Sequence, residues 1–147
     1  MKFHKSVFIL CTLAAGFASH GCGSNPDHSR SNAEDADNNQ VDVEKFTQYF
    51  NDYRARNGRQ AVRLDNQLLE NARQNNIMQQ QYGLGHHYMG RGTRRQNSAW
   101  NYGSIEAVMN GWHHSSGHNV NLNATDVNCY GIHWLGTYWT MDLGYCP

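Results

Sequence analysis

The sequence has no excess of charge of either sign. Its 147 residues include 12 Lys and Arg against 12 Asp and Glu, and charged residues make up only 16% of the chain. A neutral chain offers no basic surface to a phosphate backbone, so nucleic acid is not expected as a partner. The length is that of one domain. With so few charges, the surface must stay hydrated largely through amide and hydroxyl groups.

The sequence also lacks an apolar run long enough to cross a bilayer, which takes roughly 20 residues. The apolar stretch Val7–Ala18 is shorter than this and follows the basic residues Lys2 and Lys5. A basic start followed by a short apolar run is typical of a secretory signal peptide. We therefore predict that residues 1–21 form a signal peptide and that the protein is exported.

Cysteine is scarce, and its positions carry information. Cys22 follows Ser19-His20-Gly21, which approximates a lipobox, so we expect lipidation at Cys22 and a lipid anchor in the membrane. The alternative is plain secretion after a cut near Ala18 or Gly21. If Cys11 leaves with the signal peptide and Cys22 takes the lipid, Cys129 and Cys146 remain as an even pair. Such a pair predicts a disulfide in an oxidising compartment.

Large apolar residues are missing from the segment 23–40, which consists mainly of Asn, Asp, Ser and Ala. Such a composition cannot bury enough surface to offset the loss of chain entropy on folding. We therefore interpret residues 22–40 as a disordered tether. The folded domain is expected over residues 41–147.

Helices are predicted in three parts of this domain. Apolar residues between Val43 and Tyr53 share one helical face, and Asn57-Gly58 marks the end of that helix. A second helix is expected from an N-cap at Asp65 to about Gln81, although Asn75 and Asn76 interrupt its apolar stripe. Ser104 is the expected N-cap of a third helix.

The remaining segments are predicted to be a long loop and two strands. Tyr82 to Asn101 is rich in Gly and shows no lasting periodicity, which favours a loop. Two runs of aromatic and β-branched residues at 129–134 and 137–143 predict strands. Leu135-Gly136 lies between them, so the strands are expected to form a hairpin.

Motifs that would establish an enzyme are absent. The sequence contains no HExxH or CxxC ligand set. Ser115 and Ser116 lie near His118, but the same segment has no carboxylate to orient that histidine as a catalytic triad requires. His113, His114 and His118 cluster in the sequence, yet Ser115-Ser116-Gly117 is expected to end the helix and separate them. The sequence therefore favours a protein that is not an enzyme.

Four stretches, in order, resemble the bacterial branch of the CAP superfamily (cysteine-rich secretory proteins, antigen 5 and pathogenesis-related class 1 proteins). The most specific is Gly111-Trp-His-His-Ser-Ser-Gly-His-Asn-Val-Asn-Leu122. The others are Phe50-Asn-Asp-Tyr-Arg-Ala-Arg-Asn-Gly58 with Val62-Arg-Leu-Asp65, the pair His86-His87, and Tyr130-Gly-Ile with Tyr138-Trp-Thr-Met-Asp-Leu-Gly144. Together they cover nearly all of residues 44–145.

This resemblance implies an α+β fold, a three-layer α/β/α sandwich with a small antiparallel sheet between helices. It also implies a central cleft with two histidines and two glutamates. His118 matches the second histidine, and the first is His86 or His87, of which we favour His87. The glutamates are replaced by Gln96 and Ser115, so the cleft lacks both family acids.

Three functions are compatible with this pattern. We favour a non-catalytic, lipid-anchored protein of the cell envelope or outer membrane, acting as a monomer, whose cleft binds an envelope ligand or a protein. The second is a metal-dependent hydrolase of envelope polymers or secreted proteins, with a divalent ion such as zinc held by His87 and His118. The alternative to this metal site is that His118 has a structural role and links loops. The third, lipid binding, follows from family analogy alone.

Overall fold

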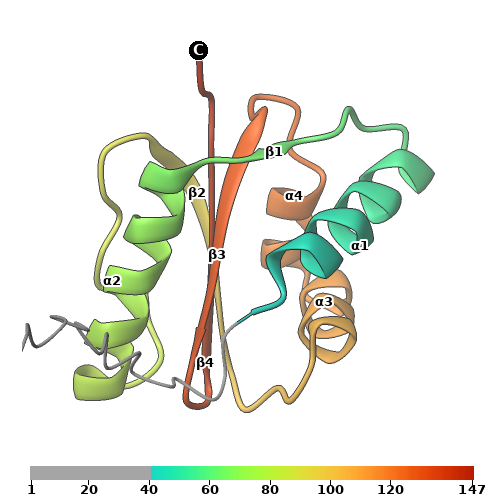
Figure 1. Ribbon diagram of the computed structural model, residues 1–147. Coiled ribbons are helices and arrows are strands. Elements are labelled where there is room, and N and C mark those ends of the chain that lie inside the picture. The colour runs from blue at the N-terminus through green and yellow to red at the C-terminus, as the bar shows by residue number, and fades with distance from the viewer. Residues whose placement is uncertain (1–40) are drawn as a thin grey trace, which may run out of the picture. The chain divides into compact units, whose positions relative to one another are not determined.

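The computed structural model describes residues 41–147. The predicted signal peptide, the predicted lipidation site Cys22 and the predicted tether lie outside the described residues. Within the described range no helix combines the length and hydropathy that crossing a membrane requires. The elements follow in the order α1 (Val43–Arg56), β1 (Arg63–Leu64), α2 (Asn66–Tyr82), β2 (Thr93–Trp100), α3 (Ile105–His114), α4 (Ser116–Leu122), β3 (Cys129–Leu135) and β4 (Tyr138–Gly144) (Figure 1).

The three predicted helices are confirmed, because each carries its own start signal. Side-chain oxygens of Asp42, Asp65 and Ser104 accept hydrogen bonds from backbone N–H groups three residues further on, as N-caps do. Helix α1 ends at Arg56, with Asn57 of the predicted Asn57-Gly58 stop as its C-cap. A break at Ser115 separates α3 from the short helix α4.

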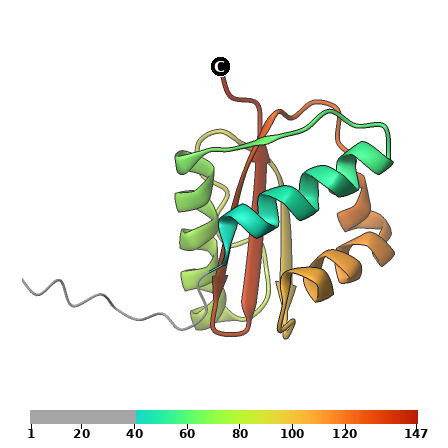
Figure 2. The same ribbon diagram turned by 45° about the vertical axis from the view of Figure 1, so that its right-hand side comes forward.

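The sheet has the strand order β1-β3-β4-β2. Strands β3 and β4 form the predicted antiparallel hairpin, and β2 pairs with β4, also antiparallel. The two-residue strand β1 pairs with β3 in parallel, so the sheet is mixed rather than purely antiparallel. The three-layer α+β fold itself is confirmed, with α2 on one face of the sheet and α1, α3 and α4 on the other (Figures 1 and 2).

Strand β2 corrects the prediction of a continuous loop from Tyr82 to Asn101. Three of its four buried residues, Gln96, Asn97 and Ser98, are polar, and the fourth is the small Ala99. A strand is recognised in a sequence by apolar residues at alternate positions, and β2 has no such alternation. The loop is therefore confined to the segment between α2 and β2.

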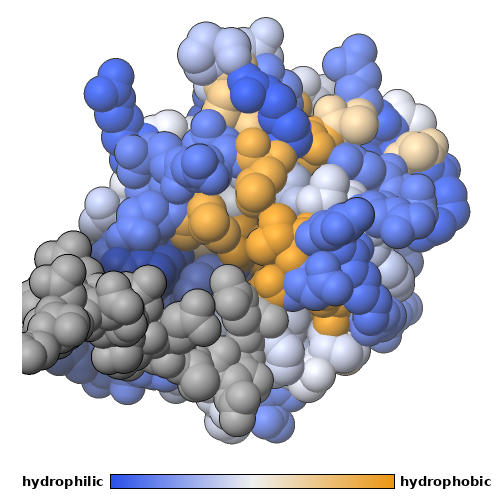
Figure 3. All heavy atoms as spheres, in the orientation of Figure 1, coloured by the Kyte–Doolittle hydropathy of each residue, from blue (hydrophilic) through white to orange (hydrophobic). Residues whose placement is uncertain are grey.

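The two faces of the sheet are packed differently. The face covered by α1, α3 and α4 holds an apolar core whose members include Phe46, Phe50, Trp112, Tyr130, Trp139 and Met141. Helix α2 instead buries four amides, from Asn71, Asn75, Asn76 and Gln79. The outer surface is mostly hydrophilic in Figure 3, with apolar atoms gathered between α2 and α1.

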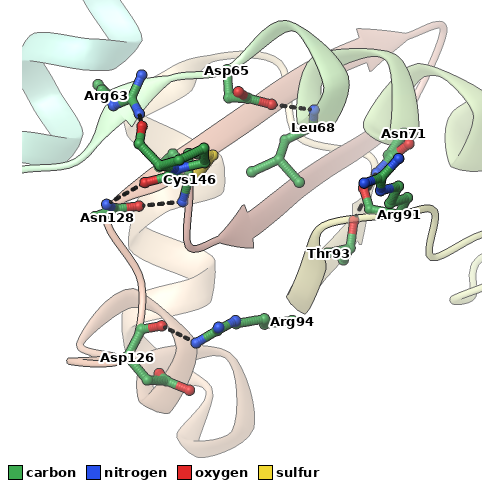
Figure 4. Close-up of a disulfide and its surroundings, with 12 residues drawn as sticks. Arg63, Asp65, Leu68, Asn71, Arg91, Thr93, Arg94, Asp126, Asn128 and Cys146 are labelled. Carbon is green, nitrogen blue, oxygen red and sulfur yellow. Dashed lines mark hydrogen bonds between the residues drawn. A yellow bond between two sulfur atoms is a disulfide. The ribbon is translucent and has the colours of Figure 1, made fainter.

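The predicted disulfide between Cys129 and Cys146 is present. It joins the start of β3 to the segment after β4. The side chain of Asn128 brackets Cys146, because it donates to the Cys146 carbonyl over 2.8 Å and accepts from the Cys146 N–H over 2.7 Å (Figure 4). The end of the described chain is thus held by the disulfide, by the two hydrogen bonds of Asn128, and by one that Arg63 of β1 donates to the carbonyl of Pro147.

Candidate functional site

The buried amide of Asn75 fixes the loop that carries the two adjacent histidines. Its Oδ1 accepts from the N–H of Tyr88 over 2.9 Å, and its Nδ2 donates to the carbonyl of Gly85 over 3.1 Å. These contacts lie on either side of His86 and His87. Asn75 interrupts the apolar stripe of α2 because its side chain satisfies the backbone of this loop.

The side chains of His86 and His87 point to different partners. Nδ1 of His86 lies 2.8 Å from Oε1 of Gln96. His87 is turned elsewhere: its Nε2 lies 2.9 Å from the carbonyl of Gly83, and its ring packs against Tyr82 with 5.8 Å between the ring centroids. The structure therefore places His86 beside Gln96, and the preference for His87 is corrected. The position of a side chain on an irregular loop has no periodicity from which the sequence could reveal it.

His118 lies on α4 and is half-buried. Burial, and to a lesser extent the charge of the nearby His86, lowers the pKa of His118. A lowered pKa keeps this imidazole neutral at neutral pH. Of the two loop histidines, His86 is the one whose charge acts on His118.

Two asparagines hold α4 against β2. The Asn97 side chain donates to the carbonyl of His118 over 3.2 Å. Asn121 in turn donates to Oδ1 of Asn97 over 2.9 Å and to the carbonyl of Gln96 over 3.2 Å. The helix that carries His118 is thereby positioned by the same strand that carries Gln96.

An acid that the sequence analysis missed lies behind Gln96. Asp142 is directly opposite Gln96 in the pairing of β2 with β4, and its side chain is fully buried. Nε2 of Gln96 donates to Oδ1 of Asp142 over 2.9 Å. Burial raises the pKa of Asp142 to about 7, although hydrogen bonds from Gln96 and Thr93 act in the opposite direction. The available signal was a lone carboxylate within the aromatic and apolar run of β4.

A surface hollow of about 240 Å³ adjoins His118. Its lining combines apolar and aromatic groups with a hydroxyl and an imidazole, from Leu84, Ser98, Ala99, Trp100, Tyr102, Gly111, Trp112, Ser115 and His118. Hollows of similar size lie between α1 and α3 and elsewhere on the surface, so volume alone does not distinguish this one. This hollow differs in that its lining contains His118 and Ser115, two of the predicted site residues. We use "the cleft" below for this hollow together with His86 and Gln96.

The structure places four of the predicted site residues in two pairs. Ser115 and His118 line the hollow, and His86 is paired with Gln96. His113 is directed to α1, where its Nδ1 lies 3.1 Å from the hydroxyl of Tyr53. His113 packs against His114, with 4.8 Å between the ring centroids, whereas His118 lines the hollow, so the three histidines of the sequence do not form one cluster in space.

The described residues do not fit a catalytic zinc centre. Among residues 41–147, no three side chains of His, Cys, Asp or Glu are grouped so that they could hold a metal ion. Catalytic zinc sites have three protein ligands and an open position. His86 and His118 supply two nitrogens at most, and their neighbours Gln96 and Ser115 are neutral.

Comparison with known proteins identifies similar chains. Residues 47–140 match the model of the cysteine-rich secretory protein family (CAP). A search of curated proteins found no significant match.

Three solved bacterial structures share the fold. An extracellular protein containing an SCP domain from Bacillus anthracis str. Ames has a TM-score of 0.63 at 17% identity, over 70% of this chain and 40% of the other. A cysteine-rich secretory protein from Staphylococcus aureus subsp. aureus Mu50 has a TM-score of 0.60 at 14% identity, over 71% and 38%. An outer surface protein from Borrelia burgdorferi has a TM-score of 0.57 at 15% identity, over 74% and 98%. The chain thus spans about two fifths of the length of the first two proteins.

Proposed function

Since the chain belongs to the cysteine-rich secretory protein (CAP) family, we propose that it is an exported cell-envelope protein whose cleft binds a ligand without transforming it. The observation that carries this proposal is the composition of the cleft. Small-molecule sites are concave and mainly apolar, with a few polar groups that orient the ligand. The hollow beside His118 has this character.

The lining favours a ligand with one apolar face and one polar edge. Trp100 is 53% exposed and Leu84 is 56% exposed, and both line the hollow. Ser115 and the neutral imidazole of His118, which also line the hollow, offer hydrogen bonds. An exposed tryptophan beside hydrogen-bonding groups suits a sugar ring or an amphipathic peptide.

The same residues speak against catalysis. Asp142 is fully buried and bonded to Gln96, so it cannot act on a ligand in the hollow. Within residues 41–147, no carboxylate is hydrogen-bonded to His118 to orient it as a general base beside Ser115. The hydrolase alternative also lacks the third metal ligand.

Export is supported by the disulfide and by the structural relatives. The Cys129–Cys146 bond persists in oxidising compartments, and the similar proteins from Bacillus anthracis and Borrelia burgdorferi are described as extracellular and outer-surface proteins. We propose that Cys22 carries a lipid that anchors the domain. In detergent phase separation, Cys22→Ser should move the protein from the detergent phase to the aqueous phase. An unchanged distribution would leave plain secretion.

Ligand binding is tested by ¹H–¹⁵N NMR titration of the purified protein with two soluble probes, chitotriose and an amphipathic tripeptide. We expect saturable shifts in residues around Trp100 and His118 with at least one probe. Trp100→Ala should abolish them, while Tyr145→Ala, which removes an aromatic ring 60% exposed outside the hollow, should not. Turnover of either probe that is lost in His118→Ala would overturn the non-catalytic assignment.

A further inference from the structure

The side-chain amide of Gln96 is buried and has a partner at every polar atom. Its Nε2 donates to the carbonyl of Tyr88 over 2.8 Å and to Oδ1 of Asp142 over 2.9 Å. Its Oε1 lies 2.8 Å from Nδ1 of His86. Only 5% of Gln96 is exposed, so water cannot replace these partners freely.

The chemistry of these partners determines which way the amide points. A backbone carbonyl can only accept, so the group beside Tyr88 has to be the NH₂ of Gln96. An ionised Asp142 carboxylate also accepts only, and takes the second N–H. The carbonyl oxygen of Gln96 is then the atom that faces His86. If the amide were reversed, Oε1 would face the carbonyl of Tyr88 and neither atom could donate.

The direction of the amide in turn determines the tautomer of His86. Because Oε1 of Gln96 has no proton to give, Nδ1 of His86 must carry the hydrogen of their bond. A neutral imidazole has one protonated nitrogen, so Nε2 of His86 keeps its lone pair.

We propose that Gln96, oriented by Asp142 and the Tyr88 carbonyl, is a positioning residue that holds His86 in its Nδ1–H tautomer and leaves the lone pair of Nε2 on this exposed side chain as an acceptor. The cleft then suits a ligand that offers a hydroxyl or N–H group at this point, and disfavours one that offers only a carbonyl or carboxylate. This preference among ligands rests on the proposed binding function. The tautomer of His86 does not, because it follows from the hydrogen bonds of Gln96 alone.

Asp142 explains why an amide, and not an acid, serves this purpose. A glutamate carboxylate at position 96 would lie beside the Asp142 carboxylate and the Tyr88 carbonyl and could donate to neither. Oδ2 of Asp142 is buried and makes no hydrogen bond within the described part of the chain, while Oδ1 accepts from Gln96.

The tautomer is measured by long-range ¹H–¹⁵N NMR of the imidazole rings in the full, ligand-free protein. At pH about 8, a histidine of ordinary pKa, about 6.5, is neutral. We expect His86 to show a protonated Nδ1 and an unprotonated Nε2. His87 is an internal reference with the opposite tautomer, Nε2–H, because its Nε2 faces the Gly83 carbonyl and must carry the hydrogen.

Gln96→Met keeps the length of the side chain and removes its polar atoms, so His86 should change to the Nε2–H form. Asp142→Asn keeps an acceptor at position 142 and should leave the Nδ1–H form of His86 in place. A wild-type His86 in the Nε2–H form, or an unchanged tautomer in Gln96→Met, would overturn the proposal. Because no ligand is used, a failure here is distinct from a failure of the proposed binding function.

Discussion

Asp142 shows how a single residue couples the interior of this protein to pH. The native state holds its proton more tightly than the unfolded chain, because burial raises the pKa of Asp142 from 3.8 to about 7. Between these two values the unfolded chain is ionised while the native state stays protonated. The free energy of unfolding must therefore fall as the pH rises through this window.

We predict that Asp142→Asn removes this dependence. Each unit of pKa corresponds to about 1.4 kcal/mol. From pH 4 to pH 7.5, the free energy of unfolding of the variant should therefore rise relative to that of wild type by up to about 4 kcal/mol. Denaturant unfolding at both pH values measures the difference. Asp126→Asn is the control, because Asp126 is an exposed partner of Arg95 and its pKa is lowered rather than raised. Parallel pH profiles for wild type and Asp142→Asn would contradict the prediction.

Thr140 is a second buried residue of β4, and its hydroxyl links this strand to α2. Its hydroxyl accepts from Asn75 over 3.0 Å and from Gln79 over 2.9 Å, and donates to Asn76 over 2.6 Å. All the hydrogen-bonding capacity of one hydroxyl is thus used between β4 and α2.

Thr140→Val should destabilise the protein by about 3 kcal/mol or more, because three buried amides each lose a hydrogen bond that a methyl group cannot replace. Thr140→Ser keeps the hydroxyl and loses only a methyl group, at about 1 kcal/mol. Thermal and denaturant unfolding of the two variants separates the loss of the hydrogen bonds from the loss of packing. Equal destabilisation in both would show that the hydroxyl contributes little.

At the scale of elements, α2 lies unusually close to β3. A Cβ atom added at Gly131 would lie 2.1 Å from the backbone carbon of Leu68 and 2.1 Å from the backbone nitrogen of Leu69. Glycine is therefore required here by the approach of two backbones. This approach brings the amides of α2 within reach of Thr140 and of the loop that carries His86.

Gly131→Ala is expected to lower the free energy of unfolding by about 3 kcal/mol or more, because backbone atoms cannot move aside as side chains can. Gly117→Ala in α4 is the matched control. Nothing lies within 4 Å of a Cβ at Gly117, and alanine should stabilise that helix by up to about 1 kcal/mol. Denaturant midpoints of both variants provide the test, and a fully stable Gly131→Ala would mean that α2 can shift away from the sheet.

How far the elements could be predicted depended on where their signals lie. Helix α1 and the β3–β4 hairpin were predicted because periodicity, caps and turn residues are local in the sequence. Strand β2 was missed because three of its four buried residues are polar. Those residues are stable inside only because partners come from distant segments, as when Asn121 binds Asn97.

On the scale of the whole molecule, the disulfide closes the domain. Cys129 and Cys146 are 17 residues apart, and their bond joins the two ends of the hairpin. A cross-link that closes a loop of this size stabilises a fold by about 3 kcal/mol, mainly because it restricts the unfolded chain.

We predict that replacing both Cys129 and Cys146 by alanine lowers the free energy of unfolding by about 3 kcal/mol. A reducing agent should bring wild type down to the stability of this double variant and leave the variant itself unchanged. Unfolding with and without reductant provides the comparison. If reductant has no effect on wild type, the bond does not contribute to stability in solution.

By itself, the sequence determined the family resemblance, the fold class, the three capped helices, the hairpin and the cysteine pair. All of these depend on neighbouring residues, on simple periodicities or on counting. Only the tertiary structure decided that His86 rather than His87 meets Gln96, and that Asp142 lies behind it. The physical reason is that these contacts depend on an irregular loop and on the register between β2 and β4, which joins residues 46 positions apart.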